Sequence, residues 1–262
     1  MALLTFLTDF GTSDYYVAAV KGTVLRLAPG SQIVDISHEV PSGDIATGAF
    51  LLSAATPWFP EGTVHLAVVD PGVGSRRRIL AARAANGWLV LPDNGLLTLL
   101  RGTVSSIRSV ENTDVFLPGP GQTFHGRDRF APVAAWLLRG ERPEELGPEI
   151  DDPVLLPLEM PRREPGHLSG QVVHVDRYGN LITDIPTGWL PEGPCRAEVA
   201  GRSATLRAGH YAEIPEGFKG EAEGEAAMIP GSLGTVELSL RGDDLARRWI
   251  VERGASVRIT WE

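Results

Sequence analysis

The chain has 262 residues, a formal net charge of −9, 43% hydrophobic residues and 22% charged residues. These values are typical of a globular protein with one large domain or two modest ones. No basic stripe accompanies the acidic balance, so nucleic acid and anionic membrane surfaces are not expected partners.

Strand-like and helix-like stretches alternate in the first half of the chain. Residues 15–27 have helical spacing, with Val17, Val20, Val24 and Leu27 on one face and a stop at Pro29-Gly30. Repeated strand–helix–strand units predict a mainly parallel sheet covered on both faces. The predicted strands are residues 3–8, 32–36 and a strand ending at residue 69; the other predicted helices are 44–56, with Asp44 as its N-cap, and 128–138.

Residues 79–91, in the first half, predict a hairpin around Asn86-Gly87. The sequence pattern changes in the second half, where prolines and acids between residues 141 and 166 indicate a linker. Six short strands follow, at residues 171–175, 181–185, 196–199, 226–229, 235–240 and 256–261. Their spacing is typical of a small β-barrel or sandwich. We therefore expect an N-terminal α/β domain over residues 1–163 and a C-terminal β-barrel-like domain over residues 164–262.

Cysteine and histidine spacing argue against a metal site. Cys195 is the single cysteine, which excludes an intramolecular disulfide and a cysteine-based zinc site. No His-x-x-x-His pair occurs, so no metal is expected. The apolar N-terminus lacks a basic lead and predicts a first strand rather than a signal peptide. No apolar run approaches the ~20 residues of a membrane helix, and we expect a cytoplasmic protein.

Two Gly-rich segments carry the strongest chemical signal. Asp70-Pro71-Gly72-Val73-Gly74-Ser75-Arg76-Arg77 follows an apolar strand, and Thr123-Phe124-His125-Gly126-Arg127-Asp128 precedes a predicted helix. Together they supply a carboxylate, a guanidinium and an imidazole that can polarise a water molecule. The alternative is a structural clamp between Asp70 and Arg77. Most charges in a run of three arginines, residues 76–78, are expected to be solvated.

Three further turns are candidates for ligand binding. Asp9 ends the first strand, where its carboxylate could accept bonds from ribose hydroxyls or cap the following turn. Asp14 is expected to N-cap the next helix, with a ligand role left open. Asn180 could present a donor and an acceptor to an adenine edge, with Tyr178 or Tyr211 stacking on the base. The alternative is an ordinary Gly-Asn turn with aromatic packing. Dinucleotide and Walker A fingerprints are missing, which disfavours NAD and ATP.

Seven motifs in order resemble the S-adenosylmethionine hydroxide adenosyltransferases, formerly domain of unknown function 62, which are similar to bacterial fluorinases and chlorinases. The resemblance spans nearly the whole chain. The motifs are Thr8-Asp9-Phe10-Gly11, Val34-Asp35-Ile36-Ser37-His38, Phe59-Pro60-Glu61-Gly62-Thr63-Val64-His65, Asp70-Pro71-Gly72-Val73-Gly74, Pro92-Asp93-Asn94-Gly95, Thr123-Phe124-His125-Gly126-Arg127-Asp128 and Asp176-Arg177-Tyr178-Gly179-Asn180-Leu181-Ile182-Thr183.

The resemblance implies a Rossmann-like N-terminal α/β domain, a C-terminal small β-barrel-like domain and a homotrimer with substrate sites between neighbouring subunits. It implies that Asp70, Arg77 and His125 are catalytic. In the halogenating relatives the acid matching Asp70 is replaced and the histidine motif is altered. Because this chain keeps all three residues, the resemblance favours a hydrolase.

The same resemblance assigns the substrate contacts. It implies Asp9 for the ribose, Asn180 for adenine, Tyr178 and Tyr211 for packing on adenine, and the turn at Ser232 for the methionine carboxylate. The region around residue 176 differs by one residue in length from the halogenase pattern.

The expected reaction is hydrolysis of S-adenosyl-L-methionine at the ribose 5′ carbon to give adenosine and L-methionine, with no cofactor. Arg77 would favour hydroxide character, His125 would orient the water or accept its proton, and Asp70 would fix both. Two alternatives stay open: a halogenase of the same fold, and a non-catalytic sensor that binds S-adenosylmethionine.

Overall fold

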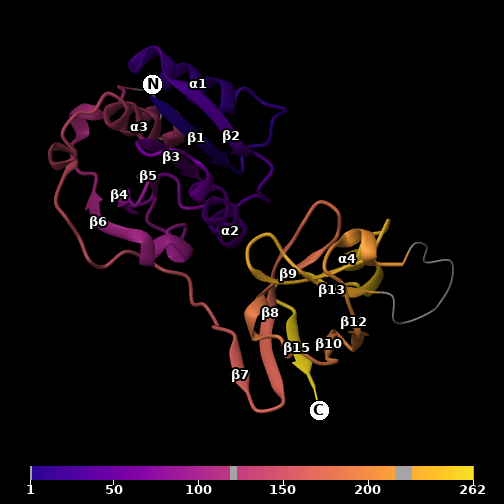
Figure 1. The fold of residues 1–262 in the computed structure, drawn as a ribbon. Helices are drawn as coiled ribbons and strands as arrows, with labels where there is room; N and C mark the ends of the chain where they lie inside the picture. Colours follow the sequence, from indigo (N-terminus) through magenta and orange to yellow (C-terminus); the bar gives the residue numbers. More distant parts are fainter. Residues whose placement is uncertain (1, 119–122, 216–225, 262) are drawn as a thin grey trace. The chain divides into compact units, whose positions relative to one another are not determined.

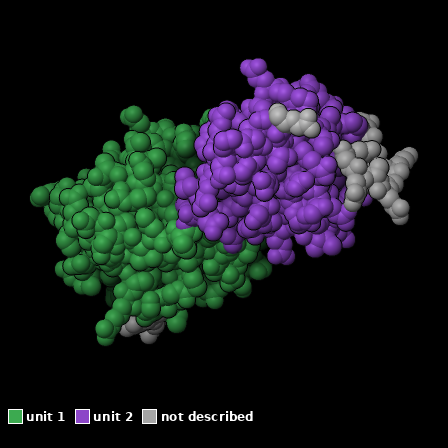
Figure 2. Space-filling model, turned by 90° about the horizontal axis from the view of Figure 1, so that it is seen from below, with its two compact units in different colours: residues 1–157 green, residues 158–262 purple. Residues whose placement is uncertain are grey.

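The computed structural model describes residues 2–118, 123–215 and 226–261, in two compact units, residues 1–157 and 158–262 (Figure 2). We call them the first and second unit. The strands of the first unit are β1 (Leu3–Thr8), β2 (Gln32–Ser37), β3 (Thr63–Val68), β4 (Ile79–Ala84), β5 (Gly87–Pro92) and β6 (Val104–Ser109). Its helices are α1 (Tyr16–Leu27), α2 (Ile45–Ala55), α3 (Ala131–Leu138), the 3₁₀ helices η1 (Thr56–Trp58), η2 (Thr98–Thr103), η3 (Thr113–Val115) and η5 (Pro143–Leu146), and the π-helical turn η4 (Gly126–Phe130).

The first unit is built on a six-stranded sheet of order β2-β1-β3-β5-β4-β6 (Figure 1). Strands β2, β1, β3 and β5 are parallel, and β4 is antiparallel to both β5 and β6. The predicted strands and helices of this half are therefore confirmed in type and place. Strand β6 was not predicted, because its sequence alternates weakly between apolar and polar residues.

Both faces of this sheet are covered, as the alternation of elements predicts. Helices α1 and α3 pack against Phe6 and Leu66 on one face (Figure 1). Helix α2 and η2 pack against Leu7 and Ala67 on the other. Neighbouring residues of one strand thus pack against helices on opposite faces of the sheet, which fixes the register of β1 and β3. The Asp44 carboxylate caps α2 by accepting a hydrogen bond of 3.1 Å from the Thr47 backbone N–H, as expected.

The hairpin between β4 and β5 exists, but its turn lies one residue earlier than predicted. Ala84 pairs with Gly87, so Ala85 and Asn86 form the loop and Gly87 begins β5. A Cβ at Gly87 would lie 1.8 Å from the Thr63 carbonyl oxygen of β3. Glycine is therefore required here for the close approach of two backbones rather than for a positive φ in the turn.

Two buried histidines of the first unit bond to threonine hydroxyls of β1. His65 Nδ1 lies 2.8 Å from Thr5 Oγ1, and His38 Nδ1 lies 2.8 Å from Thr8 Oγ1. Burial lowers the pKa of His65 to about 4, and burial also lowers the pKa of His38 in spite of the nearby Asp35 carboxylate. Both side chains bond within the first unit and line neither of the cavities described below.

The Pro-rich segment after η5 is fixed to the first unit by side chains of the sheet end. Asp93 accepts a 2.7 Å hydrogen bond from the Val154 backbone N–H, and Arg78 donates to Asp152 at 2.7 Å. Arg78 also pairs with Asp93, so it is not the solvated cation expected from the arginine run. At Gly95, φ is +110°, and a Cβ would lie 2.7 Å from Leu156.

The second unit consists of short strands that curl into a nearly barrel-shaped sheet of order β11-β10-β15-β8-β9-β14-β13-β12, with β7 paired to β8 (Figure 1). All described pairs are antiparallel except β12 with β13. The strands are β7 (Arg162–Glu164), β8 (His167–Val175), β9 (Leu181–Pro186), β10 (Arg196–Val199), β11 (Arg202–Ala204), β12 (Leu206–Arg207), β13 (Ala227–Pro230), β14 (Thr235–Ser239) and β15 (Ser256–Thr260). The helices are η6 (Thr187–Trp189), η7 (Tyr211–Glu213) and α4 (Leu245–Trp249).

The six predicted strands of this half are confirmed, and the structure adds β7, β11, β12 and α4. Each added element has five residues or fewer, which is too short to show a recognisable alternation of apolar and polar residues. Helix α4 is capped by Asp244, whose carboxylate accepts from the Arg247 N–H at 2.8 Å. Among the residues described, no helix has the length and apolar character required to cross a bilayer.

Candidate active site

The first cavity lies in the first unit, at the carboxyl ends of the parallel strands β1 and β3. Its volume is about 290 Å³. Ligands of open α/β sheets bind at this end of the strands, because the loops that follow them converge there. The cavity is lined by Asp9, Phe10, Tyr15, Tyr16, Val68, Asp70, Val73, Thr123, Phe124, His125 and Gly126.

Asp70 and Arg77 form the contact expected of them. Arg77 Nε donates to both carboxylate oxygens, at 2.7 and 2.8 Å, and its Nη2 donates to Asp70 Oδ2 as well. The Arg77 side chain is only 8% exposed and the Asp70 side chain only 4%. The loop returns to Asp70 through Gly74, whose φ is +83°. Arg77 is thus paired with a buried carboxylate, as expected, and is not one of the solvated charges of the arginine run.

His125 completes the cluster from a different segment. Its Nδ1 lies 3.1 Å from Arg77 Nη2. A guanidinium group can only donate, so Nδ1 accepts and the proton of the neutral ring sits on Nε2. Nε2 is buried and has no hydrogen-bond partner within the described parts of the chain. Burial lowers the pKa of His125, and the charges of Arg129 and Arg77 lower it further. The ring is thus neutral at pH 7, with an N–H available to a ligand.

The backbone around His125 is held by packing. His125 directly precedes η4, so the predicted helix opens with a π-helical turn before α3. A Cβ at Gly126 would lie 3.2 Å from the ring of Phe10. The glycine thus allows this turn to pack closely against the β1 loop. The Arg77 guanidinium lies 5.0 Å from the ring centre of Phe130, which holds it from the other side.

Asp9 lines the cavity and Asp14 does not. Asp9 accepts a 2.8 Å hydrogen bond from the backbone N–H of Gly43, on a distant loop, rather than capping its own turn. Asp14 is exposed, and the predicted N-cap is wrong: the residue at that position is Tyr15, which makes no side-chain cap bond. Tyr15 already has helical backbone angles, which removes the extended geometry that a capping residue needs.

Aromatic rings form one wall of the first cavity. The ring centres of Tyr15 and Tyr16 are 4.6 Å apart, and that of Phe124 lies 5.1 Å from Tyr16 and 6.1 Å from Phe10. Such ring faces attract cations. Phe10, Tyr15 and Tyr16 are absent from the residues predicted on sequence grounds. The sequence signal that could have found them is the occurrence of three aromatic residues among residues 10–16, just after the first strand.

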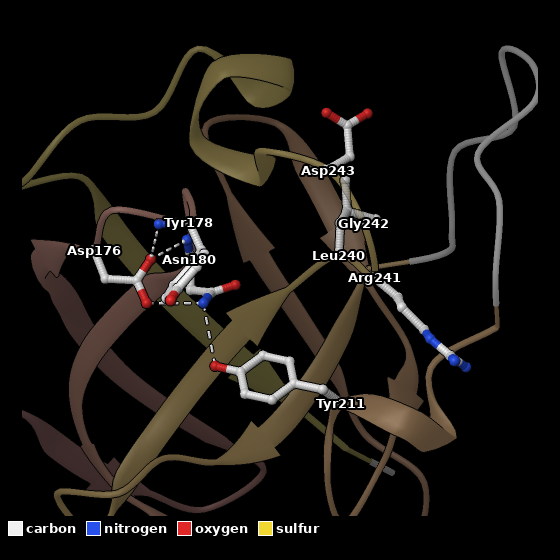
Figure 3. A pocket seen from close by; sticks show the side chains of 8 residues that line it. All are labelled: Asp176, Tyr178, Asn180, Tyr211, Leu240, Arg241, Gly242 and Asp243. Carbon is white, nitrogen blue, oxygen red and sulfur yellow. Dashed lines mark hydrogen bonds between the residues drawn. The ribbon is translucent and has the colours of Figure 1, made fainter.

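The second cavity, of about 560 Å³, belongs to the second unit (Figure 3). The predicted turn at residues 176–180 forms its edge. Asp176 Oδ1 accepts from the backbone N–H groups of Tyr178 and Asn180, at 2.8 and 2.9 Å. The Gly179 carbonyl accepts a hydrogen bond of 2.9 Å from the Ala246 backbone N–H of α4, so this helix holds the turn in place. The lining residues are Asp176, Tyr178, Asn180, Tyr211, Leu240, Arg241, Gly242 and Asp243.

Asn180 differs from its expected arrangement. Its Nδ2 donates to Asp176 Oδ2 at 2.8 Å and to the Tyr211 hydroxyl at 3.1 Å, so both amide hydrogens are used within the protein. Only the amide oxygen is left for a ligand, rather than a donor and an acceptor together. Tyr178 is 75% exposed at the cavity edge. The Tyr211 hydroxyl donates to Glu237, a buried residue missing from the predicted set.

Six predicted site residues line the two cavities: Asp9, Asp70 and His125 line the first, and Tyr178, Asn180 and Tyr211 line the second. Arg77 is not in the lining of either cavity and contacts Asp70 and His125. Ser232 is exposed in the turn between β13 and β14 and, like Asp14, lines neither cavity. In the described ranges, no group of three or more His, Cys, Asp or Glu side chains is arranged to hold a metal ion.

The two units match two protein-family models. Residues 4–147 match the SAM hydroxide adenosyltransferase N-terminal domain, and residues 170–258 match the C-terminal domain of the same enzymes. The chain belongs to the S-adenosylmethionine hydroxide adenosyltransferase family, as its motifs predict.

Hydrolases and fluorinases are among the relatives of known name. The chain is 36% identical to the (R)-S-adenosyl-L-methionine hydrolase of Salinispora tropica, over 98% of this chain and 97% of the relative. It is 39% identical to the hydrolase of the same name from Thermus thermophilus, over 97% and 98%. A fluorinase of an Actinoplanes species is 32% identical over 70% and 71%. A crystal structure of an uncharacterized conserved protein from Thermotoga maritima superposes with a TM-score of 0.90 and 32% identity, covering 98% of this chain and 100% of that one.

Proposed function

We propose that this protein hydrolyses S-adenosyl-L-methionine to adenosine and L-methionine. The observation that carries the proposal is the buried contact of Asp70, Arg77 and His125 at a cavity wall. It occurs in a chain whose full-length relatives carry the name of that hydrolase. The fluorinase relatives are less similar to it.

The substrate is divided between the two cavities in this proposal. The first holds the ribose at Asp9 and places the 5′ carbon near Asp70 and His125. The second holds adenine at Asn180, between the rings of Tyr178 and Tyr211. We assign the exposed turn at Ser232 to the methionine carboxylate, and we keep Asp14 as a substrate-binding residue outside the two cavities.

Water attacks the 5′ carbon from the side opposite the sulfonium. A C–O bond forms, the C–S bond breaks with its electron pair moving to sulfur, and the water gives up one proton. His125 donates its Nε2 hydrogen to the water oxygen, since Nδ1 is occupied by Arg77. We assign the released proton to the Asp70 carboxylate. Positive charge on sulfur is lost in this step, so a dry pocket favours it, and the balance requires no cofactor.

We further propose a homotrimer in which the first cavity of one subunit meets the second cavity of its neighbour. Each unit contains one half of the required contacts, and a closed ring of three chains would complete three equal sites. Because its substrate is an intracellular metabolite, we place the enzyme in the cytoplasm.

The pH dependence tests the role of His125. Its pKa is lowered by burial and by neighbouring cations, so the ring is neutral above pH 6.5. Protonation requires a proton at Nδ1, which breaks the bond from Arg77. We therefore expect kcat/KM to be constant near pH 7 and to fall only below pH 6.5. In His125→Gln this acidic limb should disappear along with most of the activity. A limb centred above pH 6.5, or one unchanged in the variant, would argue against this role.

Isotope labelling tests the reaction itself. In ¹⁸O-water, the label should appear in the 5′ oxygen of adenosine. Molar chloride should not divert the reaction, because Nε and Nη2 of Arg77 already donate to Asp70 and His125 rather than to an anion. Mass spectrometry of the nucleoside product separates the outcomes. Unlabelled adenosine or a dominant 5′-chloro nucleoside would overturn the hydrolase assignment, and tight binding with no product would indicate a sensor.

A further inference from the structure

Glu237 is a buried carboxylate that the proposed reaction does not use. It is 6% exposed, in the middle of β14 between the fully buried Val236 and Leu238. Ser239 Oγ donates to its Oε1 at 3.0 Å, and the Tyr211 hydroxyl donates to the same oxygen. Burying a carboxylate costs free energy unless hydrogen bonds satisfy it. An apolar residue would be the simpler choice at this position, so the contact with Tyr211 requires an explanation.

The carboxylate fixes the direction of a chain of hydrogen bonds. A carboxylate can only accept, so the Tyr211 O–H must point to Glu237. The Tyr211 oxygen is then left as an acceptor, and Asn180 Nδ2 donates to it at 3.1 Å. The hydroxyl pKa of Tyr211 is raised, first by burial and then by Glu237, which keeps the proton on the tyrosine. Each bond in this chain therefore has one allowed direction.

A second carboxylate fixes Asn180 from the other side. Asp176 Oδ2 accepts the remaining amide hydrogen at 2.8 Å. Turning the amide over would place its oxygen against Asp176 Oδ2, which repels it. Asn180 is only 3% exposed, and Figure 3 shows its amide oxygen turned away from both Asp176 and Tyr211. The cavity therefore meets one acceptor at this position and no amide donor.

We propose that Glu237 is a positioning residue which, through Tyr211, holds the Asn180 oxygen toward the cavity and makes the site select 6-amino over 6-oxo purines. The inference rests on the proposed function in that the nucleoside of S-adenosylmethionine occupies this cavity. The 6-amino group of adenine donates to the Asn180 oxygen, whereas the 6-oxo group of hypoxanthine opposes it with a second acceptor. Sites built on such polar groups reject a mismatched analogue strongly.

The test compares adenosine with inosine by calorimetry, and S-adenosyl- with S-inosyl-L-methionine by turnover. We expect the wild-type protein to prefer the 6-amino ligand by at least about 10²-fold. Tyr211→Phe and Glu237→Leu should each reduce that preference by roughly tenfold or more, mainly through KM, with kcat little changed. Glu237→Gln should retain it, because the glutamine carbonyl still accepts from Tyr211. Glu198→Leu, at an exposed glutamate of β10, is the matched control and should retain it as well.

Each outcome decides the proposal. A merely structural role of Glu237 would lower stability without changing the ratio between the two purines. If Glu237→Leu does not fold, Tyr211→Phe, which keeps the aromatic ring, gives the answer alone. A wild-type protein without preference, or a Tyr211→Phe protein with its preference intact, overturns the inference. A clear preference for adenosine without turnover of S-adenosylmethionine would overturn the proposed function and leave this inference standing.

Discussion

Arg77→Lys is expected to lower the turnover of S-adenosylmethionine by about 10²–10⁴-fold while leaving its binding within a few-fold of wild type. Arg77 holds both partners at once, since its Nε and Nη2 donate to Asp70 and Nη2 also reaches His125. Lysine keeps the positive charge but has no planar fork to hold both. Rates of adenosine formation and equilibrium binding of the substrate, measured on the same preparation, separate the two effects.

The neighbouring arginine provides the matched control. Arg76 is exposed on the same loop, and Arg76→Lys should retain wild-type turnover. Asp70→Asn and His125→Gln should each show a loss of the same order as Arg77→Lys. Because the three side chains act as one unit, a variant that combines Asp70→Asn with His125→Gln should lose little more turnover than either single variant. Fully additive losses, or wild-type turnover in any of the three, would remove the cluster from the mechanism.

Mixing two inactive variants is expected to restore activity if sites are shared between subunits. Asp9→Ala damages the first cavity and Asn180→Ala the second, and each alone should reduce activity to a few per cent of wild type, a loss of roughly 2 kcal/mol. After subunit exchange at equal amounts, about a quarter of the sites in a closed ring combine an intact first cavity with an intact second one. Activity should rise to about that fraction of wild type.

The control for this experiment places both substitutions in one cavity. A mixture of Asp9→Ala with Asp70→Ala cannot produce an intact first cavity in any arrangement, so its activity should not rise. If the Asp9→Ala and Asn180→Ala mixture also stays inactive, although mass spectrometry detects mixed oligomers, each site is made within one chain. A fully active monomer in light scattering would contradict the shared site directly.

The elements of the fold were predictable wherever packing imposes a period. Helix α1 buries Val17, Val20 and Val24, as its spacing indicates. The hairpin turn was misplaced because Asn86-Gly87 matches a favoured turn sequence, whereas Gly87 is needed for a tertiary contact with Thr63. A contact between residues distant in sequence leaves no local pattern from which to predict it.

In the candidate site, too, local contacts could be predicted from the sequence and contacts between distant residues could not. The contact of Asp70 with Arg77 was predictable, because a Gly-rich loop returns the chain within seven residues. Glu237 was not, because a single glutamate in a short strand resembles a solvent-facing residue. Only the fold places it beneath Tyr211. The donor role of His125 also required structure, since it follows from which ring nitrogen faces Arg77.

The buried histidines of the first unit make its stability depend on acidity. His38, His65 and His125 all have lowered pKa values, so the folded state binds fewer protons than the unfolded chain below pH 6.5. Their stabilising contribution is complete above pH 6.5 and is lost as the pH falls, by up to about 1.4 kcal/mol per pH unit for each. For His65 this loss continues to about pH 4.

The second unit contains a group whose pKa shift has the opposite effect on the pH dependence of stability. Burial raises the pKa of Asp184, so the folded second unit takes up a proton more readily than the unfolded chain and gains stability on acidification. Amide hydrogen exchange at pH 7 and pH 5 should therefore show protection falling in the first unit well before the second. Mild acid would leave a chain whose second unit is folded and whose first unit has begun to unfold.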